Sequence, residues 1–185
     1  MGQKTNKIFE RAKLNLEEEN HENALRLFNE VLNREPTHAK ALRSKAMIKI
    51  ITADKYEAEG FLHFALEQQP EDDQLHQMLG TLYHNNDEPD RAKKHFNKAV
   101  DLNDSNALAY RGLGMVYANQ YGEHDQAIAF FTKAINLEPE SGELYFFRGC
   151  SYMIQHRQQE AKTDLQKATD LDHPKAKEML DKYFG

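Results

Sequence analysis

The sequence predicts an all-α fold of five helix pairs followed by one C-terminal helix, and two regularities support this prediction. Apolar residues recur at three- and four-residue steps over most of the chain, which is the spacing of amphipathic helices. The pattern also repeats with a period of about 34 residues, which indicates a stack of similar helix pairs. The clearest marker of this period is an alanine, found at Ala24, Ala58, Ala92, Ala127 and Ala161.

The repeated pattern divides the 185 residues into five units of one domain. Each unit has a first helix, a polar turn and a second helix, and a proline ends four of the units because it cannot continue a helix. The fourth unit is one residue longer, and we expect its extra residue in the turn around Tyr121, Gly122 and Glu123. The expected units are residues 5–38, 39–72, 73–106, 107–141 and 142–175, followed by a capping helix at 176–185.

Glycines inside the expected first helices indicate close helix crossings. Gly80, Gly114 and Gly149 stand where alanine would be about 1 kcal/mol more favourable in an isolated helix. This cost is tolerable where a neighbouring helix approaches too closely for a side chain. We expect the phenylalanines of the second helices, such as Phe96 and Phe131, to fill the space at these crossings.

The C-terminal stretch is too short for a sixth unit. Ala176, Met179, Leu180 and Tyr183 keep helical spacing, and lysines and acids occupy the other positions. A stack of repeats needs its last apolar face covered. We therefore expect this stretch to be a capping helix.

Composition limits the classes of partner. The net charge is -6 and the isoelectric point about 5.8, which argues against binding nucleic acid by phosphate neutralisation. The single cysteine, Cys150, allows no intramolecular disulfide and fits a reducing compartment. The N-terminus has no apolar run long enough for a signal peptide or a membrane span, so we expect a cytoplasmic protein without membrane insertion. A leader removed before this start would leave the same sequence.

No motif points to a catalytic or metal site. The nine histidines form no His-x-x-x-His pair or zinc motif, and four of them, including His38, fall near expected turns where a solvated imidazole is the default. Gly112-Leu113-Gly114 lies inside an expected helix and is interpreted as packing. We therefore expect no enzyme activity, no cofactor and no metal.

With these residues placed, the chain resembles the tetratricopeptide repeat (TPR) family over residues 5–175. The resemblance implies a right-handed α-α superhelix whose first helices line a concave groove, and it implies nothing about catalysis. No unit has a tryptophan at its fourth position, which is a common departure. In unit four the shared residues are Gly114, Tyr117, Ala127, Phe131, Ala134 and Pro139.

The best-known TPR groove grips the C-terminal carboxylate of chaperones with Lys, Asn, Asn, Lys and Arg side chains. None of the three possible registers supplies this set; the register from unit one holds Phe9, Lys13, Ser44, Gln74 and Met78. A carboxylate clamp of this kind is therefore not expected.

The resemblance also implies which side chains face the groove, and eleven of them are our candidate site. Apolar members would receive apolar side chains of a ligand, amides would bind an extended backbone, and arginines would pair with acids. Neighbouring apolar residues such as Ile50, Ile51 and Ile154 belong either to the groove or to helix packing. The candidate residues are Lys40, Arg43, Met47, Gln77, Thr81, Asn85, Arg111, Met115, Asn119, Phe146 and Cys150.

Two functions fit these features. The first is a non-catalytic adaptor or scaffold that binds a protein or peptide segment in the groove. The second is a structural subunit or assembly chaperone of a larger secretion or envelope complex, using convex or end surfaces. The predicted partner segment is acidic with apolar anchors, because the expected groove cations outnumber the expected groove acids. The cations are Lys13, Lys40, Arg43 and Arg111, and the acids are Glu17 and Glu143. The oligomeric state is left open.

Overall fold

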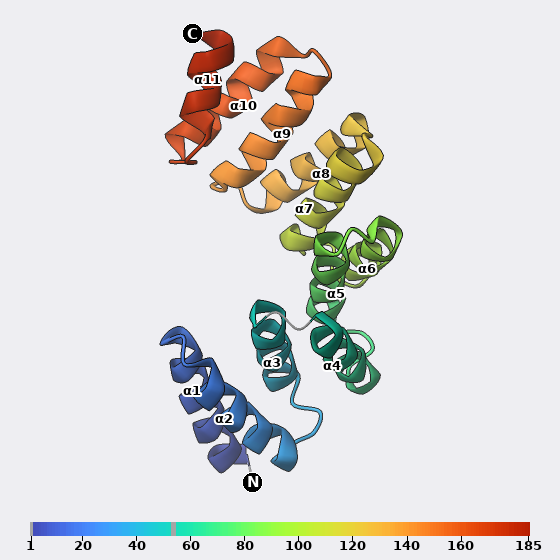
Figure 1. The fold of residues 1–185 in the computed structure, drawn as a ribbon, viewed down its shortest axis with the longest axis vertical. Coiled ribbons are helices and arrows are strands. Elements are labelled where there is room, and N and C mark those ends of the chain that lie inside the picture. The colour runs from blue at the N-terminus through green and yellow to red at the C-terminus, as the bar shows by residue number, and fades with distance from the viewer. Residues whose placement is uncertain (1, 53–54) are drawn as a thin grey trace.

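The computed structural model describes residues 2–52 and 55–185, and these residues form eleven α-helices and one π-helical segment with no strand among them (Figure 1). The prediction of an all-α fold is confirmed. The elements are α1 (Gly2–Glu17), α2 (His21–Arg34), α3 (Ala39–Ile51), α4 (Lys55–Gln68), α5 (Asp73–Asn85), α6 (Pro89–Leu102), α7 (Ala107–Val116), η1 (Tyr117–Tyr121), α8 (His124–Leu137), α9 (Gly142–Ile154), α10 (Gln158–Asp170) and α11 (Ala176–Phe184).

The helices stack in chain order into a curved, right-handed solenoid. The two termini lie at opposite ends of a crescent, with α1 at one tip and α11 at the other (Figure 1). Odd-numbered helices up to α9 are the first members of their pairs, and α11 packs on α10 at the end of the stack. The unit boundaries and the capping role of α11 remain predictions, and residues 53 and 54 of the expected second unit lie outside the described residues.

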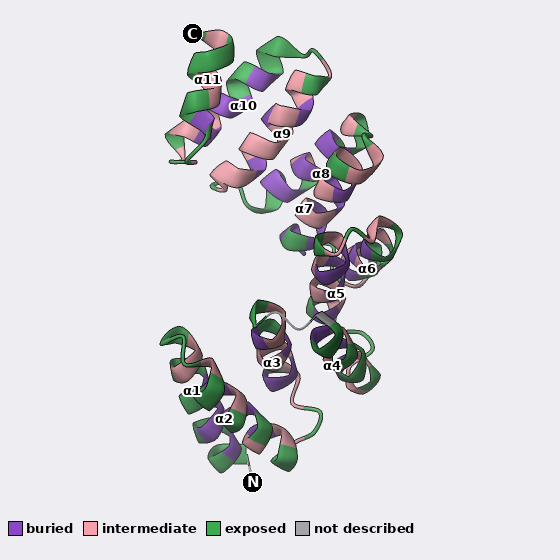
Figure 2. Ribbon diagram, viewed as in Figure 1, coloured by how far each residue is buried: buried purple, intermediate pink, exposed green. Residues whose placement is uncertain are grey.

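Buried side chains lie between the packed helices along the solenoid (Figure 2), and two clusters of them meet at α3. Ala41 and Ile48 of α3 pack with the cluster of α1 and α2. Leu42 and Ala46 of the same helix pack with the long cluster that runs from α3 to α9. Helix α3 is therefore apolar on two faces, because it joins two cores.

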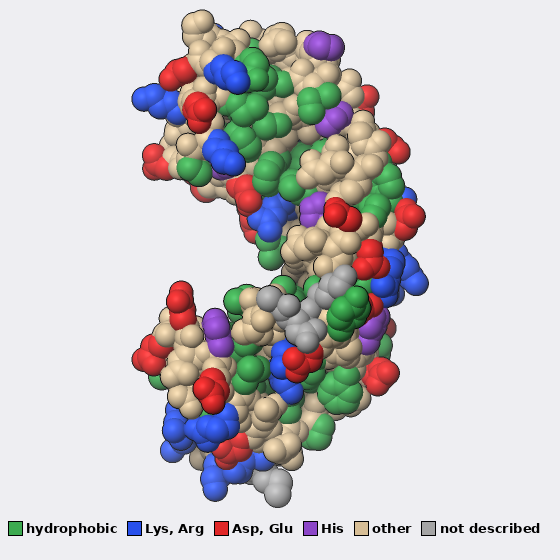
Figure 3. All heavy atoms as spheres, viewed as in Figure 1, with side chains coloured by type: hydrophobic (Ala, Val, Ile, Leu, Met, Phe, Trp, Pro, Cys, Tyr) green, Lys and Arg blue, Asp and Glu red, His purple; other side chains and the backbone are tan. Residues whose placement is uncertain are grey.

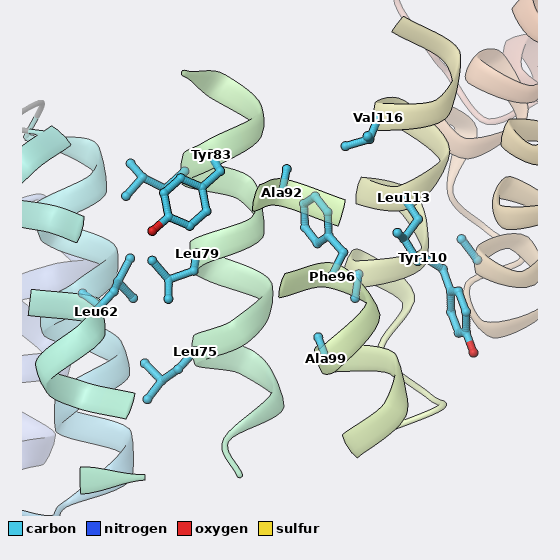
Figure 4. Close-up of a cluster of buried hydrophobic side chains, with 14 of the residues drawn as sticks. Leu62, Leu75, Leu79, Tyr83, Ala92, Phe96, Ala99, Tyr110, Leu113 and Val116 are labelled. Atoms are coloured by element: carbon cyan, nitrogen blue, oxygen red, sulfur yellow. The ribbon is translucent and has the colours of Figure 1, made fainter. Parts of the chain in front are cut away.

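Gly80 and Gly114 have the cause that we expected, whereas Gly149 is less crowded, with Leu165 in place of a phenylalanine and a Cβ distance of 3.3 Å to its Cγ. A Cβ atom on Gly80 would lie 2.6 Å from Phe96 Cδ1, and one on Gly114 would lie 2.5 Å from Phe131 Cε1. Gly112 also packs on the Phe96 ring, where a Cβ would be 2.3 Å from Cζ, so Phe96 is held between α5 and α7 (Figure 4). The Gly112-Leu113-Gly114 stretch thus serves helix packing.

Backbone geometry locates the extra residue of the fourth unit. Asp87 and Gly122 are the left-handed residues of two successive turns, with φ values of 57° and 68°, and they are 35 residues apart. Tyr83 and Tyr117, earlier in the same units, are only 34 apart. The extra residue therefore lies between Tyr117 and Gly122, within η1, where the Gly122 N–H donates to the Tyr117 carbonyl. We expected the insertion around Tyr121, Gly122 and Glu123, and η1 ends at Tyr121 with Gly122 as its C-cap. The location therefore agrees, but a π-helical turn and not a longer loop accommodates the extra residue.

Candidate functional site

The concave side of the solenoid carries a continuous groove. Three hollows follow one another along it, with volumes of about 450, 540 and 180 Å³. Met47 and Met78 line both the first and the second, and Thr81 and Leu108 line both the second and the third. The groove therefore runs from α1 across α3, α5 and α7 to α9, and the space-filling view shows the molecule hollowed between its two arms (Figure 3).

Apolar side chains flank the middle hollow from two helices. Met47 on α3 is 40% exposed and Leu108 on α7 is 44% exposed, on either side of α5. Between them, α5 contributes the amides of Gln74 and Gln77. Exposed apolar walls beside amide groups can hold an apolar side chain and bind the backbone next to it.

Some of the polar groups of the groove already bind one another. Gln77 Nε2 donates to Thr81 Oγ1 over 2.9 Å, and Thr81 Oγ1 donates to the Gln77 carbonyl over 3.1 Å. These bonds orient the Gln77 side chain along α5. The oxygen of its side-chain amide, Oε1, can still accept a hydrogen bond from a ligand.

Both candidate arginines have intramolecular partners. Arg43 Nη1 lies 2.6 Å from Asp72 Oδ2. Asp72 also caps α5, because its Oδ1 accepts hydrogen bonds from the backbone N–H groups of Gln74 and Leu75. Arg111 Nη1 lies 2.5 Å from Glu143 Oε2. These arginines hold successive first helices together, which limits their role in pairing with acids of a ligand.

Eight of the eleven candidate residues line the three hollows, and three lie elsewhere. Asn119 is exposed on η1. The Phe146 ring stacks on His173 with centroids 4.2 Å apart. Cys150 is half-buried, and burial raises the pKa of its thiol to about 11, so it is not an activated nucleophile. The eight in the hollows are Lys40, Arg43, Met47, Gln77, Thr81, Asn85, Arg111 and Met115.

The candidate set omitted several groove residues. Met78 was missed because it directly precedes Leu79, a core residue, and the pattern gives no sign that the apolar face of α5 extends into the groove. Phe9 and Leu108 stand at positions that the resemblance assigns to the groove, and they line its hollows, but they were not among the eleven candidates.

A cluster of polar aromatic residues lies between α4, α5 and α6, and its members do not line the groove. Tyr83 is buried, and its hydroxyl donates to Glu59 over 2.8 Å while Arg91 and His63 lie within 3.0 Å of it. Burial is the main cause that raises the pKa of Tyr83 well above its ordinary value, with the Glu59 hydrogen bond second. Tyr83 therefore stays a neutral donor that ties α5 to α4.

Two histidines of this cluster share a hydrogen bond. His76 Nδ1 and His95 Nδ1 are 3.1 Å apart, and His76 Nε2 is 3.4 Å from the Pro70 carbonyl. Because a carbonyl only accepts, Nε2 of His76 holds the proton and its Nδ1 accepts from His95. Burial lowers the pKa of His95 to about 4, so both rings are neutral at pH 7.

His38 differs from our expectation of a solvated imidazole. It is half-buried, its Nδ1 accepts from the Ala41 amide over 3.1 Å, and its ring lies 4.9 Å from the Phe9 ring. The reason is its position as the N-cap residue of α3.

Within residues 2–52 and 55–185, no group of three ligating side chains is arranged to hold a metal ion. Among the helices of these described residues, none combines the length and the hydrophobicity that a membrane span requires.

This helical solenoid and its groove agree with the family comparison. The model for the family described as "Psidin, N-terminal TPR repeats region" matches residues 6–185. The chain belongs to this family, and it is a TPR-type helical repeat protein. TPR proteins are generally non-catalytic protein–protein interaction modules.

Solved structures with the same fold include several TPR proteins. MamA is similar over 96% of this chain and 96% of its own, with a TM-score of 0.71 and 25% identity. YrrB, described as "a TPR protein with an unusual peptide-binding site", is similar over 93% of this chain and 89% of its own, with a TM-score of 0.69 and 25% identity. The pilF protein of Pseudomonas aeruginosa shares the fold with a TM-score of 0.82 at 15% identity, over 90% of this chain and 75% of its own. No curated protein sequence matches the chain.

Proposed function

We propose that this protein is an adaptor or scaffold that binds a peptide or protein segment in its concave groove. The observation that supports this most is the middle hollow, in which Met47 and Leu108 are exposed on either side of the Gln74 and Gln77 amides. Large apolar side chains next to a hollow of about 540 Å³ suit an apolar anchor of a ligand. YrrB, a similar structure, is described as having a peptide-binding site.

The preferred ligand is a segment with apolar anchors and some acidic residues. Three of the four expected groove cations, Lys13, Arg43 and Arg111, have ion-pair partners within the chain. The fourth, Lys40, has no ion-pair partner among the described residues. Apolar anchors should therefore supply most of the affinity, and electrostatics should mainly speed association. We expect added salt to slow association more than it speeds dissociation. A single half-buried cysteine keeps the cytoplasm as our proposed location.

One observation favours the second function, a subunit or assembly chaperone that uses another surface. Tyr56 and Phe64 on α4 are 75% and 45% exposed, and they do not line the groove. Phe64 is as exposed as Leu108, so the two side chains provide matched probes of the two surfaces.

Selection from a displayed library of random peptides distinguishes the two functions. A library about 16 residues long spans roughly 50 Å when extended. We expect enriched peptides to lose at least about tenfold in affinity with Met47→Glu or Leu108→Glu, because a carboxylate in an apolar hollow is desolvated without a partner. Phe64→Glu is the control and should leave binding unchanged. Peptides that bind both groove variants normally, or none enriched at all, would refute groove binding.

A further inference from the structure

The charges of the middle hollow differ from those of its two neighbours. Asp73 and Glu138 line it, and no Lys, Arg or His is among its described lining residues. The first and third hollows each contain acids and basic residues together. Lys13 and Lys40 line the first hollow and not the middle one. The middle hollow is therefore the acidic section of the groove.

Asp73, the first residue of α5, has one carboxylate oxygen occupied and the other available. Its Oδ2 accepts from Asn103 Nδ2 over 3.0 Å and from Asn106 Nδ2 over 2.7 Å. Asn106 is 9% exposed, and its own Oδ1 accepts from the Ala109 N–H at the start of α7. These bonds fix the position of the carboxylate. Among the described residues, no donor binds Asp73 Oδ1 and no cation pairs with Asp73.

Glu138 supplies the second carboxylate of the middle hollow. It is the C-cap residue of α8 and is exposed, and its side chain has no ion pair in the described part of the chain. The arginines of the neighbouring hollows do not compensate it, because Arg43 pairs with Asp72 and Arg111 pairs with Glu143. The middle hollow thus keeps two negative charges without a cation.

Apolar side chains share this hollow with the two carboxylates. Met47 and Ile50 of α3, Met78 of α5 and Leu108 of α7 line it. Its volume of about 540 Å³ lies in the range of about 300–1,000 Å³ typical of ligand pockets, so two neighbouring side chains of a segment can enter it together. Lysine and arginine pack their long apolar chains on apolar surface while their charged ends stay in a polar environment. Apolar walls beside free carboxylates suit such a side chain.

Acidic and purely apolar side chains fit the carboxylate end of the hollow less well. An acidic side chain would be repelled by Asp73 and Glu138. An apolar side chain over Asp73 would remove water from Oδ1 without offering a hydrogen-bond donor in its place. A basic side chain replaces that water with a charged donor, and charge-assisted hydrogen bonds are stronger than neutral ones.

We propose that the middle hollow binds a lysine or arginine side chain of the ligand segment, next to the apolar anchor. This inference rests on the proposed function and adds one residue to the description of the ligand. The charged end binds Asp73 Oδ1 and the Glu138 carboxylate, and the methylene groups pack on Leu108. Acidic residues of the segment then lie outside the middle hollow.

The displayed library, selected on three forms of the protein, tests this assignment. On the wild type, enriched peptides should carry a lysine or arginine close to an apolar residue. On Asp73→Asn/Glu138→Gln the basic residue should no longer be enriched, while the apolar residue persists. The asparagine can still accept from Asn103 and Asn106 through its oxygen.

Asp101→Asn/Glu140→Gln is the matched control. It removes one aspartate and one glutamate charge at two exposed positions that do not line the three hollows. Attraction of a basic peptide to the overall charge of -6 is weakened equally by both double variants. The control should therefore retain the basic residue.

A thermodynamic cycle measures the contact itself. In an enriched peptide, norleucine in place of the basic residue removes the charge and keeps an aliphatic chain. This replacement should weaken binding about tenfold on the wild type and on the control, and less than about twofold on Asp73→Asn/Glu138→Gln. A purely structural effect of the double variant would weaken both peptides equally.

Each outcome decides the matter. Enriched peptides without a basic residue, a basic residue that persists on Asp73→Asn/Glu138→Gln, or an equal effect of norleucine on all three proteins would overturn the assignment. Loss of affinity on Met47→Glu would show in each of these cases that the groove is still the binding site. Peptides that bind Met47→Glu as tightly as the wild type would instead contradict the proposed function.

Discussion

The α3–α4 and α5–α6 pairs occupy equivalent places in the repeat but fill their interiors differently. Lys49 of α3 and Tyr83 of α5 are 34 residues apart, and so are Glu57 and Arg91, which lie beside them on the second helices. Lys49 pairs with Glu57, whereas the Arg91 guanidinium lies 3.9 Å from the centre of the Tyr83 ring. An ion pair in one repeat thus stands where a cation–π contact stands in the next.

The two helix pairs differ in how completely their side chains fill the space between the helices. Tyr83 is fully buried, and its hydroxyl has partners on both flanking helices. Beside Lys49 there remains a hollow of about 500 Å³, lined by residues of α2, α3 and α4. The comparison teaches that the period fixes where residues meet, while residue chemistry decides how tightly each pair packs.

The largest expected effect comes from giving α5 the residue of α3. Tyr83→Lys removes a buried aromatic ring together with the hydrogen bond from its hydroxyl to Glu59, and it places an ammonium group next to the Arg91 guanidinium. We expect a loss of about 3–5 kcal/mol in the free energy of unfolding, measured by chemical denaturation. Tyr83→Lys/Arg91→Glu restores the Lys–Glu combination and should recover part of the loss. A double variant no more stable than the single one would mean that the two positions are not coupled.

A second exchange concerns the helix crossing. Ala46 faces Leu62 in one pair, and Gly80 faces Phe96 at the equivalent positions of the next. Gly80→Ala should cost about 1–3 kcal/mol, because Phe96 is held from the other side by Gly112 and cannot retreat. Gly80→Ala/Phe96→Leu reproduces the Ala–Leu combination and should be more stable than Gly80→Ala alone. Equal stability of the wild type and Gly80→Ala would show that the crossing is looser than its geometry indicates.

The reverse exchange, which gives α3 the tyrosine of α5, should stabilise the α3–α4 pair, and the change in the free energy of unfolding should be smaller than in the two exchanges above. Lys49→Tyr would place an aromatic ring in the hollow between α2, α3 and α4. Position 49 is equivalent to position 83 of α5, which already holds a tyrosine. The gain should be about 1 kcal/mol, because the new ring buries apolar area but loses the Glu57 pair. The melting temperature would rise by about 2–4 °C in a chain of this size. A lower melting temperature would mean that the hollow cannot accept a ring.

Stability also depends on pH, and this dependence differs between the two pairs. His95 of α6 stands where α4 has Phe61. Burial lowers the folded pKa of His95 from 6.5 to about 4, so between these values the unfolded chain binds a proton that the folded chain refuses. The stability from this group is therefore complete above pH 6.5 and is lost as the pH falls towards 4.

His95→Phe isolates this contribution from the other acid-titrating groups. Denaturation between pH 7 and pH 4 should show a smaller loss of stability for the variant than for the wild type. Parallel pH curves for the two proteins would contradict the assignment. The groups facing His95 from the neighbouring helices are His63, His76 and Tyr83, with Arg91 and Lys94 on its own helix.

The sequence predicts the fold well because a helical repeat is specified many times over. The alanine that recurs in every unit, and the glycine–phenylalanine pairs of units three and four, supply independent evidence of the same register. The sequence locates the insertion of unit four near Tyr121 but not its form, because a π-turn and a longer loop both add one residue and the residue types of Tyr117–Tyr121 do not distinguish them.

The groove was predicted less completely than the fold. Its location follows from the repeat, and eight candidate residues do line its hollows. The sequence could not indicate that Arg43 and Arg111 have partners inside the chain, because Asp72 and Glu143 lie about 30 residues away from them. The side chains most available to a ligand, Met47 and Leu108, become evident only from their exposure.

The central claim is that a ligand binds across the first helices of the repeats. An NMR titration of the ¹⁵N-labelled protein with a library-selected peptide tests it most directly. We predict the largest amide shifts at Met47, Gln77 and Leu108, with little change at Phe64. Shifts concentrated on α4, α6 and α8, with the groove amides unmoved, would contradict the account.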